Sequence, residues 1–300
     1  MQTADSRRFL NLFGSVAEVP DSSERGGLGM ALLKKMNQVI DVGWKKIDEK
    51  PVTLSDEAMM AINLQNTKEI EISGIGKGIH RPFKVRFRSG FQKGVIDCRI
   101  GVAKTVQSHY ETSRYRKSMD TSISGPEREI LAYDVDKVCG FDLVPPTVGR
   151  NIDKLGFCSV QAWVRSPSAW EWLDKGYDYR KDTANPWLHR LVAFDYITGA
   201  IDRHSANWMI DKKRRMYAID NGYSFVKDND KRFFRSSAGK ALKGISIHPA
   251  VQWEINAISE STLAKVLQRR PFFHGEVAGV IERLRFLKGL SKWGKLGGLW

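Results

Sequence analysis

The chain has 300 residues, a formal net charge of +14 and a hydrophobic share of 42%. This length is enough for about two domains with a buried core. The excess positive charge indicates an anionic partner, either a nucleotide, an acidic protein, a nucleic acid or an anionic membrane face. The three cysteines form no Cys-x-x-Cys pair, which argues against a cysteine zinc site and favours a reducing compartment. No apolar run is long enough for a signal peptide or a membrane span, so we expect a cytoplasmic protein without a transmembrane segment.

Residues 1–65 are predicted to form a helical N-terminal extension. The stretch "GMALLKKMNQVI" carries apolar residues at helical spacing, and "TLSDEAMMAINLQ" begins with Thr53 or Ser55 as a candidate N-cap. Amphipathic helices of this kind usually pack against a core. We therefore expect a packing element here and assign it no chemistry.

Residues 66–164 are predicted to form a small, β-rich lobe with one helix. Phe83, Val85 and Phe87 alternate with basic residues, which is typical of a strand with one solvated face. Further strands are expected in "VIDCRIGVAKT" and "GFCSVQAWV". The stretch "GPEREILAYDVDKVCG" has proline at the first helical position and ends at Gly140, so it predicts a helix.

Residues 165–300 are predicted to form a larger and mainly helical lobe. Asn185 is placed to cap a helix that begins at Pro186 and ends near Gly199. A short hairpin follows, with "WMI" and "MYAI" as its strands. We expect a polar, basic loop up to about residue 250 and then two closing helices.

The hairpin brings three polar side chains together. Asn207 precedes the first strand and Asp220 follows the second, so an antiparallel pair places them opposite each other. Oxygen ligands of this type suit Mg²⁺, which takes one or two protein ligands and phosphate oxygens. Asp202 lies on the preceding loop, where a base or an orienting group for an attacking hydroxyl would stand. The alternative is a plain hairpin whose aspartates cap turns.

The joint pattern "DRHSANW" followed by "AIDNGYSF" resembles the catalytic and metal-binding loops of the phosphatidylinositol 3-/4-kinase-like family. The segment "REILAYDVDKVCGFDLVPPTV" is similar to the helix and following strand of that family. Bacterial and phage members, secretory-pathway casein kinase and actin–fragmin kinase are similar in outline. The resemblance implies an α+β, two-lobed protein-kinase-like fold. It also implies a location in the bacterial cytoplasm, or in the host cytoplasm for a phage-encoded chain.

The resemblance implies a role for each matching residue of these two loops. Asp202 would be the catalytic aspartate, while Asn207 and Asp220 would hold Mg²⁺ or Mn²⁺. His204 would support the catalytic loop or touch the transferred phosphate. Arg203 is assigned to the same catalytic group, with a structural role as its alternative.

The same resemblance implies a site for ATP on the small lobe. Lys104 would contact the phosphates, and Glu129 would pair with it, with Glu127 as the alternative because the register of the helix is open. The glycines of "GIGKG" would lie over the phosphates, and the "SVQAWV" strand would line the adenine site. These assignments comprise Gly74, Gly76, Gly78, Gln161 and Trp163.

The predicted activity is transfer of the ATP γ-phosphate to a hydroxyl, and we favour a protein acceptor. A phosphoinositide acceptor is the first alternative, and a kinase-fold binding protein with little turnover is the second. Basic residues in loop 227–243 and in tail 265–300 are candidate contacts for an anionic partner. The apolar stripe of that tail would either lie on lipid or pack on its own domain. No nucleic-acid recognition motif is present, so we expect no nucleic-acid partner.

Overall fold

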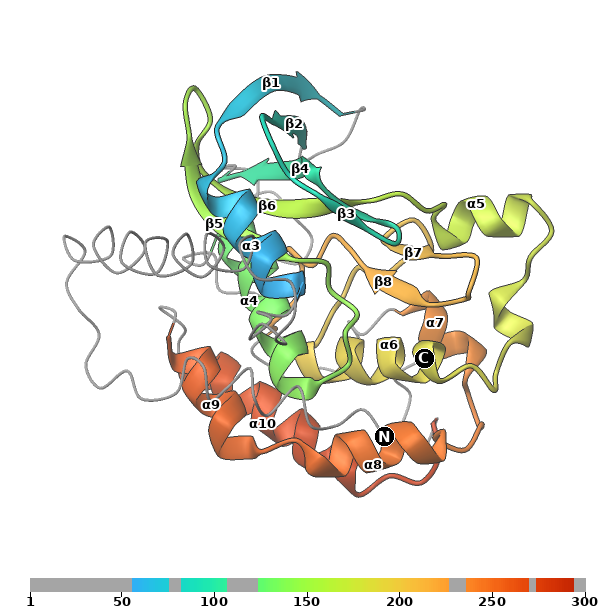
Figure 1. Ribbon diagram of the computed structural model, residues 1–300. Helices are drawn as coiled ribbons and strands as arrows, with labels where there is room; N and C mark the ends of the chain where they lie inside the picture. Colours follow the sequence, from blue (N-terminus) through green and yellow to red (C-terminus); the bar gives the residue numbers. More distant parts are fainter. Residues whose placement is uncertain (1–55, 76–81, 107–123, 227–235, 270–273, 294–300) are drawn as a thin grey trace, which may run out of the picture. The chain divides into compact units, whose positions relative to one another are not determined.

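The computed structural model describes residues 56–75, 82–106, 124–226, 236–269 and 274–293. The described residues from 57 onward form one compact unit. Within this unit a sheet with one helix forms a small lobe, and helices with a short hairpin form a larger lobe (Figure 1). This is the predicted α+β arrangement in two lobes. The predicted helices within residues 1–55 lie outside the described residues.

The small lobe is built on an antiparallel sheet with the strand order β1-β2-β4-β6-β5, and β3 pairs with β4. Neighbouring strands in this order are joined by antiparallel registers such as Phe83↔Ala103 and Ala103↔Val160. The strands are β1 Glu69–Gly74, β2 Phe83–Phe87, β3 Gln92–Lys93, β4 Ile96–Thr105, β5 Thr147–Ile152 and β6 Gly156–Val164.

The two faces of this sheet have different surroundings. On one face, buried Val85, Ala103 and Val160 pack with Met60 and Leu64 of α3 (Asp56–Asn66). We call this the outer face. Side chains directly opposite each other in antiparallel strands share a face, so the intervening residues form an inner face. The inner face therefore carries the half-exposed side chains of β2 and β4, which are free to take part in a site.

Helix α4 (Gly125–Cys139) joins the sheet to the large lobe. Ser124 caps its N-terminus: the Ser124 hydroxyl accepts the Glu127 amide, and the Glu127 carboxylate accepts the Ser124 amide. Pro126 lies in the first turn, and Gly140 ends the helix in the left-handed conformation, at φ 69°. The sequence predicted both ends of this helix correctly.

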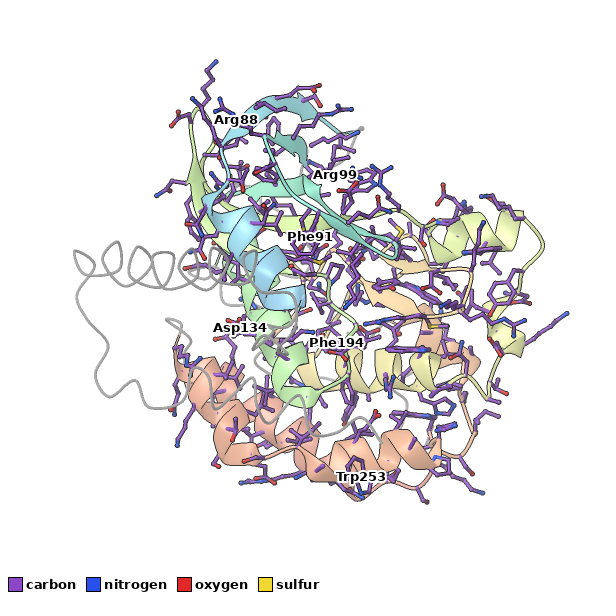
Figure 2. The ribbon with its side chains drawn as sticks, viewed as in Figure 1. Arg88, Phe91, Arg99, Asp134, Phe194 and Trp253 are labelled. Carbon is purple, nitrogen blue, oxygen red and sulfur yellow. The ribbon has the colours of Figure 1, made fainter. Side chains whose placement is uncertain are left out.

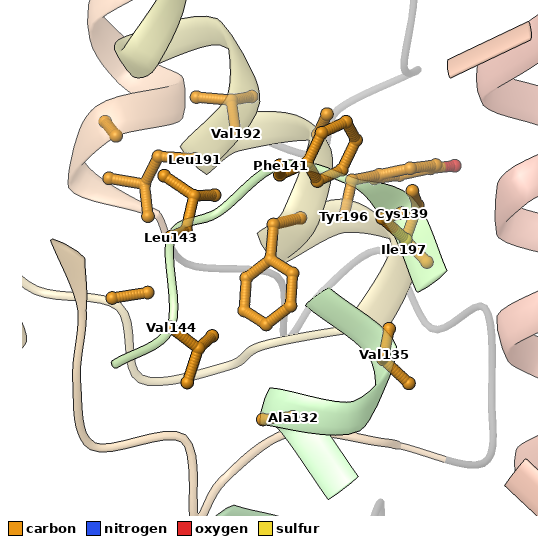
Figure 3. Packing of buried hydrophobic residues seen from close by; sticks show 14 of the residues in the cluster. Ala132, Val135, Cys139, Phe141, Leu143, Val144, Leu191, Val192, Tyr196 and Ile197 are labelled. Carbon is orange, nitrogen blue, oxygen red and sulfur yellow. The ribbon is translucent and has the colours of Figure 1, made fainter. Parts of the chain in front are cut away.

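The large lobe packs around helix α6, whose buried Phe194, Leu191 and Ile197 lie in its core. Figure 3 shows the part of this core around Phe141, where α4 and α6 meet. Phe194 is fully buried in the core, whereas Trp253 of α8 is 57% exposed; both side chains are labelled in Figure 2. The elements are α5 Ala169–Asp174, the 3-10 turn Tyr179–Lys181, α6 Pro186–Thr198, β7 Trp208–Ile210, β8 Met216–Ala218, α7 Ser237–Ala241, α8 Pro249–Ala257, α9 Glu260–Gln268 and α10 His274–Lys288.

The expectation of a continuous loop to residue 250 is wrong for residues 237–241, which form α7. Ser236 is buried and its hydroxyl accepts the Gly239 amide, so a polar sequence is held in a helical turn. The two predicted closing helices are present as α9 and α10, and a further helix, α8, precedes them. Pro249 opens α8, and Val251 and Ile255 bury one short apolar side.

The apolar stripe of the C-terminal tail packs on its own domain. Val280, Leu284 and Leu287 are buried in the large-lobe core. Trp293 is also fully buried, and its indole Nε1 donates to Nδ1 of His189 at 2.8 Å. None of the helices in the described part of the chain has the length and apolar character needed to span a bilayer.

His189 of α6 is hydrogen-bonded to Trp293 of this C-terminal segment. Because its ring can take up a proton, we expect it to make the free energy of unfolding depend on pH. Its Nε2 lies 2.8 Å from the Thr183 carbonyl, and its Nδ1 also accepts the His248 amide at 3.1 Å. Burial lowers the pKa of His189, the Thr183 carbonyl opposes this, and the nearby His248 lowers it further. Two donors on Nδ1 leave no place for a second ring proton.

We predict that the free energy of unfolding falls as pH drops through about 6.5, because the unfolded histidine takes up a proton that the folded one resists. Asp136 opposes this trend, since burial raises its pKa to about 7. We would therefore measure the free energy of unfolding in urea for the wild type and for His189→Gln, each at pH 7.5 and at pH 5.5. The quantity to compare is the change in this free energy between the two pH values. The variant should lose less stability on acidification than the wild type. Equal losses in the two proteins would contradict this role of His189.

Candidate functional site

The hairpin places Asn207 beside Asp220, as predicted. Trp208 pairs with Ala218, and the Asn207 carbonyl accepts the Ile219 amide at 3.1 Å. Asp220 follows directly and adopts a left-handed backbone conformation, at φ 54°. This conformation is uncommon for a residue other than glycine and is found at functional sites and tight turns. It ends the strand and turns the chain sharply at the aspartate.

The loop between α6 and β7 brings Asp202 to the same place. Gly199 ends α6 in the left-handed conformation, at φ 63°. The Asp202 carbonyl then accepts the His204 amide and the side-chain Nδ2 of Asn207, both at 2.9 Å. Because Nδ2 is held in this way, Asn207 offers its carbonyl oxygen Oδ1 as a ligand atom. His204 is exposed, and its Nδ1 accepts the Ala206 amide within the same loop at 3.3 Å.

Arg203 is buried and binds each segment that meets at the site. Its Nε donates to Asp195 of α6 at 2.9 Å, and Nη1 donates to the Asn207 carbonyl at 2.7 Å and to the Ile219 carbonyl. Its Nη2 donates to Oδ1 of Asn221 at 2.5 Å. The side chain is 1% exposed. Arg203 therefore acts by positioning the loops that carry Asp202, Asn207 and Asp220, which corresponds to the structural alternative for this residue.

Lys104 of β4 connects the small lobe to the hairpin. Its Nζ donates to Oε1 of Glu129 at 2.5 Å and to Oδ1 of Asp220 at 2.8 Å. Burial alone would lower the pKa of Lys104, but the two carboxylates raise it above its ordinary value, so the amine stays protonated. Glu129 Oε1 also accepts the Gly222 amide at 3.1 Å. One carboxylate of α4 thus fixes both the lysine and the chain just after Asp220.

The open choice between Glu127 and Glu129 is decided by this geometry. Glu127 faces the N-terminus of α4, where its carboxylate accepts the Ser124 amide at 2.8 Å and the Ser124 hydroxyl at 2.9 Å. Glu129 is 2% exposed and is the partner of Lys104.

The inner face of the small-lobe sheet extends this site. Lys84 lies opposite Val102, which lies opposite Gln161 in β6. Val102 and Lys104 are two residues apart on one strand, so all four side chains lie on the face that meets Asp220. Lys84 Nζ lies 5.3 Å from the centre of the Trp163 ring. The predicted residues Gln161 and Trp163 are therefore brought to the same face as Lys104.

The predicted glycine-rich turn is only partly within the described residues. Gly74 ends β1, and nothing lies within 4 Å of the position that a Cβ would take there. The Ile75 amide donates to the Pro82 carbonyl at 2.8 Å, which brings the two ends of the β1–β2 connection together. Gly76 and Gly78 lie outside the described residues.

The donor set at the hairpin fits a hard divalent cation. Asn207 Oδ1 and the Asp220 carboxylate are oxygen ligands of the kind that Mg²⁺ and Mn²⁺ accept. Within the described ranges, no group of three His, Cys, Asp or Glu side chains could hold a metal ion. A site that takes two protein ligands and completes its shell with phosphate oxygens and water does not need such a group.

The predicted basic acceptor loop is also only partly described. Lys240 and Lys243 are exposed, on and just after α7, whereas residues 227–235 lie outside the described part. Ser236 Oγ donates to Oδ2 of Asp195 at 2.9 Å, and the Ser237 amide donates to the Arg203 carbonyl at 2.9 Å. Ser236 and Ser237 are therefore hydrogen-bonded to Asp195 and to the loop that carries Arg203.

Comparison with known proteins bears on the region that contains this site. Residues 163–240 match the sequence model of the family described as phosphatidylinositol 3- and 4-kinase. The match includes the Asp202, Asn207 and Asp220 loops, and it confirms the predicted resemblance to this family. Residues 163–240 therefore resemble the phosphatidylinositol 3- and 4-kinase family, and the match supports a kinase-like fold and a phosphotransferase. No curated protein matches the sequence.

Solved kinase structures are similar to this chain at low sequence identity. A Helicobacter pylori proinflammatory kinase, CtkA, is 10% identical, with a TM-score of 0.42 over 78% of this chain and 95% of that chain. A Golgi casein kinase with Mn/ADP bound is 12% identical, with a TM-score of 0.48 over 81% and 75% of the two chains. A second Golgi casein kinase structure is 13% identical, with a TM-score of 0.47 over 83% and 76%.

Sequence reasoning missed three residues that the structure brings to the site: Lys84, Asp195 and Asn221. The alternation of Lys84 with Phe83 and Val85 predicts a solvated strand face for Lys84. In the structure that face is the inner face of the sheet, which meets Asp220. Asp195 lies in a helix whose other face is apolar, and a lone aspartate at a buried helical position is the signal that could have identified it. Asn221 carries no signal beyond its place next to Asp220.

Arg203→Lys is expected to lower the free energy of unfolding by about 3 kcal/mol, because the charge stays buried while most of its partners are lost. Arg214→Lys is the control, since the Arg214 side chain is 61% exposed and lies 3.5 Å from Asp182. Urea unfolding followed by tryptophan fluorescence measures both variants. If Arg203→Lys lowers the free energy of unfolding no more than Arg214→Lys does, the buried hydrogen-bond network of Arg203 contributes nothing to stability.

Proposed function

We propose that the chain is an ATP-dependent kinase that uses Mg²⁺ or Mn²⁺ and transfers the γ-phosphate to a hydroxyl of a protein. The observation that carries this proposal is Lys104, which lies between Glu129 of α4 and Asp220 of the hairpin. Lys104 and Asp220 are 116 residues apart in the chain. A protonated amine fixed by two carboxylates at the end of a strand is an arrangement suited to holding a nucleotide phosphate.

The residues of the inner face would bind the nucleotide. Val102 offers an apolar surface for a base, and Gln161 beside it is fixed by the bond from its Nε2 to Thr147 Oγ1 at 3.0 Å. Lys104 would hold the phosphates, and Lys84 on Trp163 adds a second positive charge to the same face. Gly74 and the turn after it would cover the phosphates through backbone amides.

The hairpin and its preceding loop would carry out the transfer. Asn207 and Asp220 would hold the divalent cation, which when bound neutralises charge on the phosphate oxygens. Asp202 would orient the acceptor hydroxyl and take its proton. Arg203 keeps these three residues in place, and His204, which is exposed beside Asp202, would support the loop or contact the phosphate.

A protein acceptor is favoured over a lipid one because of the C-terminal tail. A lipid kinase needs a surface that lies on the membrane, and the tail stripe that could have served is buried, as is Trp293. Lys240 and Lys243 are exposed beside the site and suit an acidic peptide. The description of the matching family favours a phosphoinositide as the second candidate. The cytoplasmic location stays a prediction.

The first test is incubation with γ-labelled ATP and Mg²⁺ of three samples: protein alone, protein with mixed cellular protein, and protein with phosphoinositide vesicles. We expect label in protein, and no label with the Asp220→Ala variant. Label in lipid would replace the protein acceptor with the second candidate. Bound ATP without transfer in every sample would instead favour a kinase-fold binding protein.

Asp202→Asn is expected to lower the rate of transfer about 10²–10⁴-fold, because a general base is lost, while nucleotide affinity is kept. Asp211→Asn is the matched control: Asp211 caps the hairpin turn through the Lys213 and Arg215 amides. That variant should transfer phosphate at the wild-type rate. Calorimetry measures nucleotide affinity, and label transfer measures turnover, so the two effects are separated. An unchanged transfer rate in Asp202→Asn would show that Asp202 is not the general base.

Glu129→Gln is expected to weaken nucleotide binding roughly 10–100-fold, because a charge-assisted hydrogen bond of about 1.5–3 kcal/mol no longer holds Lys104. Glu127→Gln is the matched control on the same helix. Glutamine can keep the capping box with Ser124, so this variant should bind as the wild type does. Equal affinities for the two variants would mean that Glu129 does not position the lysine.

A further inference from the structure

Two residues of α4 hold the chain that follows Asp220. Arg128 Nη1 donates to the Ser224 carbonyl at 2.6 Å and to the Phe225 carbonyl at 3.0 Å. The next residue, Glu129, accepts the Gly222 amide at 3.1 Å. Residues 222–225 are thus bonded through their main-chain groups to α4, and their position sets the direction in which the chain leaves Asp220.

Arg128 is itself held by the C-terminal helix. Its Nη2 lies 3.5 Å from Oε1 of Glu276 in the first turn of α10, and the two side chains are 0% and 1% exposed. Removing two charges from water is costly, and apolar residues of similar volume are often as stable at such a place. A planar guanidinium can, however, direct one nitrogen to a carboxylate and another to two carbonyls, which no apolar residue can do.

A second arginine of α10 continues the same attachment. Arg283 Nε donates to the Ile197 carbonyl at 3.0 Å, and Nη1 donates to the Val226 carbonyl at 3.4 Å. Gly199 allows this approach: a Cβ there would lie 3.0 Å from Arg283 Cζ and 2.8 Å from a Val226 methyl. Helix α10 therefore contacts both the end of α6, which leads to Asp202, and the end of the segment that begins at Asp220.

We propose that Arg128 and Glu276 are positioning residues for the metal-binding aspartate, and that α10 sets the geometry of Asp220 through them. The proposal deepens the kinase function proposed above and rests on it for the role of Asp220. Arg283 supports the same segment from the other end. The C-terminal helix then acts on the site through the main chain of residues 224–226, by way of Arg128 at residues 224 and 225 and of Arg283 at residue 226.

The test is the double variant Arg128→Met/Glu276→Leu, which removes both charges together and keeps much of the volume. The control is Glu260→Gln, which breaks the exposed pair between Glu260 of α9 and Arg285 of α10, at 2.8 Å. The first readout is hydrogen exchange of the peptide that spans 220–226, and it needs no substrate. The second is the factor by which Mn²⁺ strengthens ADP binding, measured by calorimetry with and without the metal.

We expect faster exchange in residues 220–226 of the double variant and a metal effect on ADP affinity at least about tenfold smaller, with metal-free ADP affinity kept. In transfer assays kcat should fall, while KM for the acceptor should stay. The control variant should match the wild type in every readout. A purely structural pair would lower the melting temperature and leave the metal effect unchanged, and that result in a folded variant would overturn the proposal.

Two further results separate this proposal from the function on which it rests. If the wild type binds Mn²⁺ and ADP but transfers no phosphate, the proposed kinase activity fails, and the metal effect still decides the role of the pair. If the double variant does not fold, Glu276→Gln replaces it, since glutamine keeps the shape and one acceptor oxygen. A smaller metal effect in that variant supports the proposal, and an unchanged one overturns it.

Discussion

The buried guanidinium of Arg203 is the interaction on which the geometry of the site depends. It joins Asp195 of α6, the carbonyls of Asn207 and Ile219, and the side chain of Asn221. These partners come from three places in the chain: Asp195 belongs to α6, Asn207 is a residue of the proposed site, and Ile219 and Asn221 flank Asp220. A charge with 1% exposure is tolerated only where it is paired and hydrogen-bonded. Loss of any one partner would leave a buried charge poorly compensated, so the loops are held in one arrangement.

Charge connects the small lobe to this arrangement in addition to the packing of α4 on the sheet, where Ile130 lies against Gly149 of β5. The outer face of the sheet packs with α3 in a cluster of its own, and α4 belongs with the large-lobe core. Lys104 then crosses from the inner face to Glu129 and Asp220. A nucleotide phosphate placed beside Lys104 would enter a contact that is already polar and charged.

The sequence predicted the local parts of this site well and the distant parts poorly, and the reason is physical. The loop of Asp202 and the hairpin of Asn207 and Asp220 lie within residues 202–220, so turn and strand rules place them. The choice between Glu127 and Glu129 stayed open, although the Ser124-x-x-Glu127 pattern is a capping box and could have assigned Glu127 to the helix end. The contact of Arg128 with Glu276 joins two helices that no local rule relates, and only the packed structure reveals it.

The charged residues of the C-terminal tail do not all lie on the surface. Lys265, Arg269, Arg285 and Lys292 are exposed, but Arg283 is 4% exposed and Glu276 is 1% exposed. Both lie on the side of α10 that also buries Val280, Leu284 and Leu287, as their spacing of three, four and seven residues requires. Two buried charges within an apolar stripe would be costly on a lipid surface, which offers them no partners. These two charges are compatible with a buried face because Arg128 pairs with Glu276, and the carbonyls of residues 197 and 226 accept hydrogen bonds from Arg283.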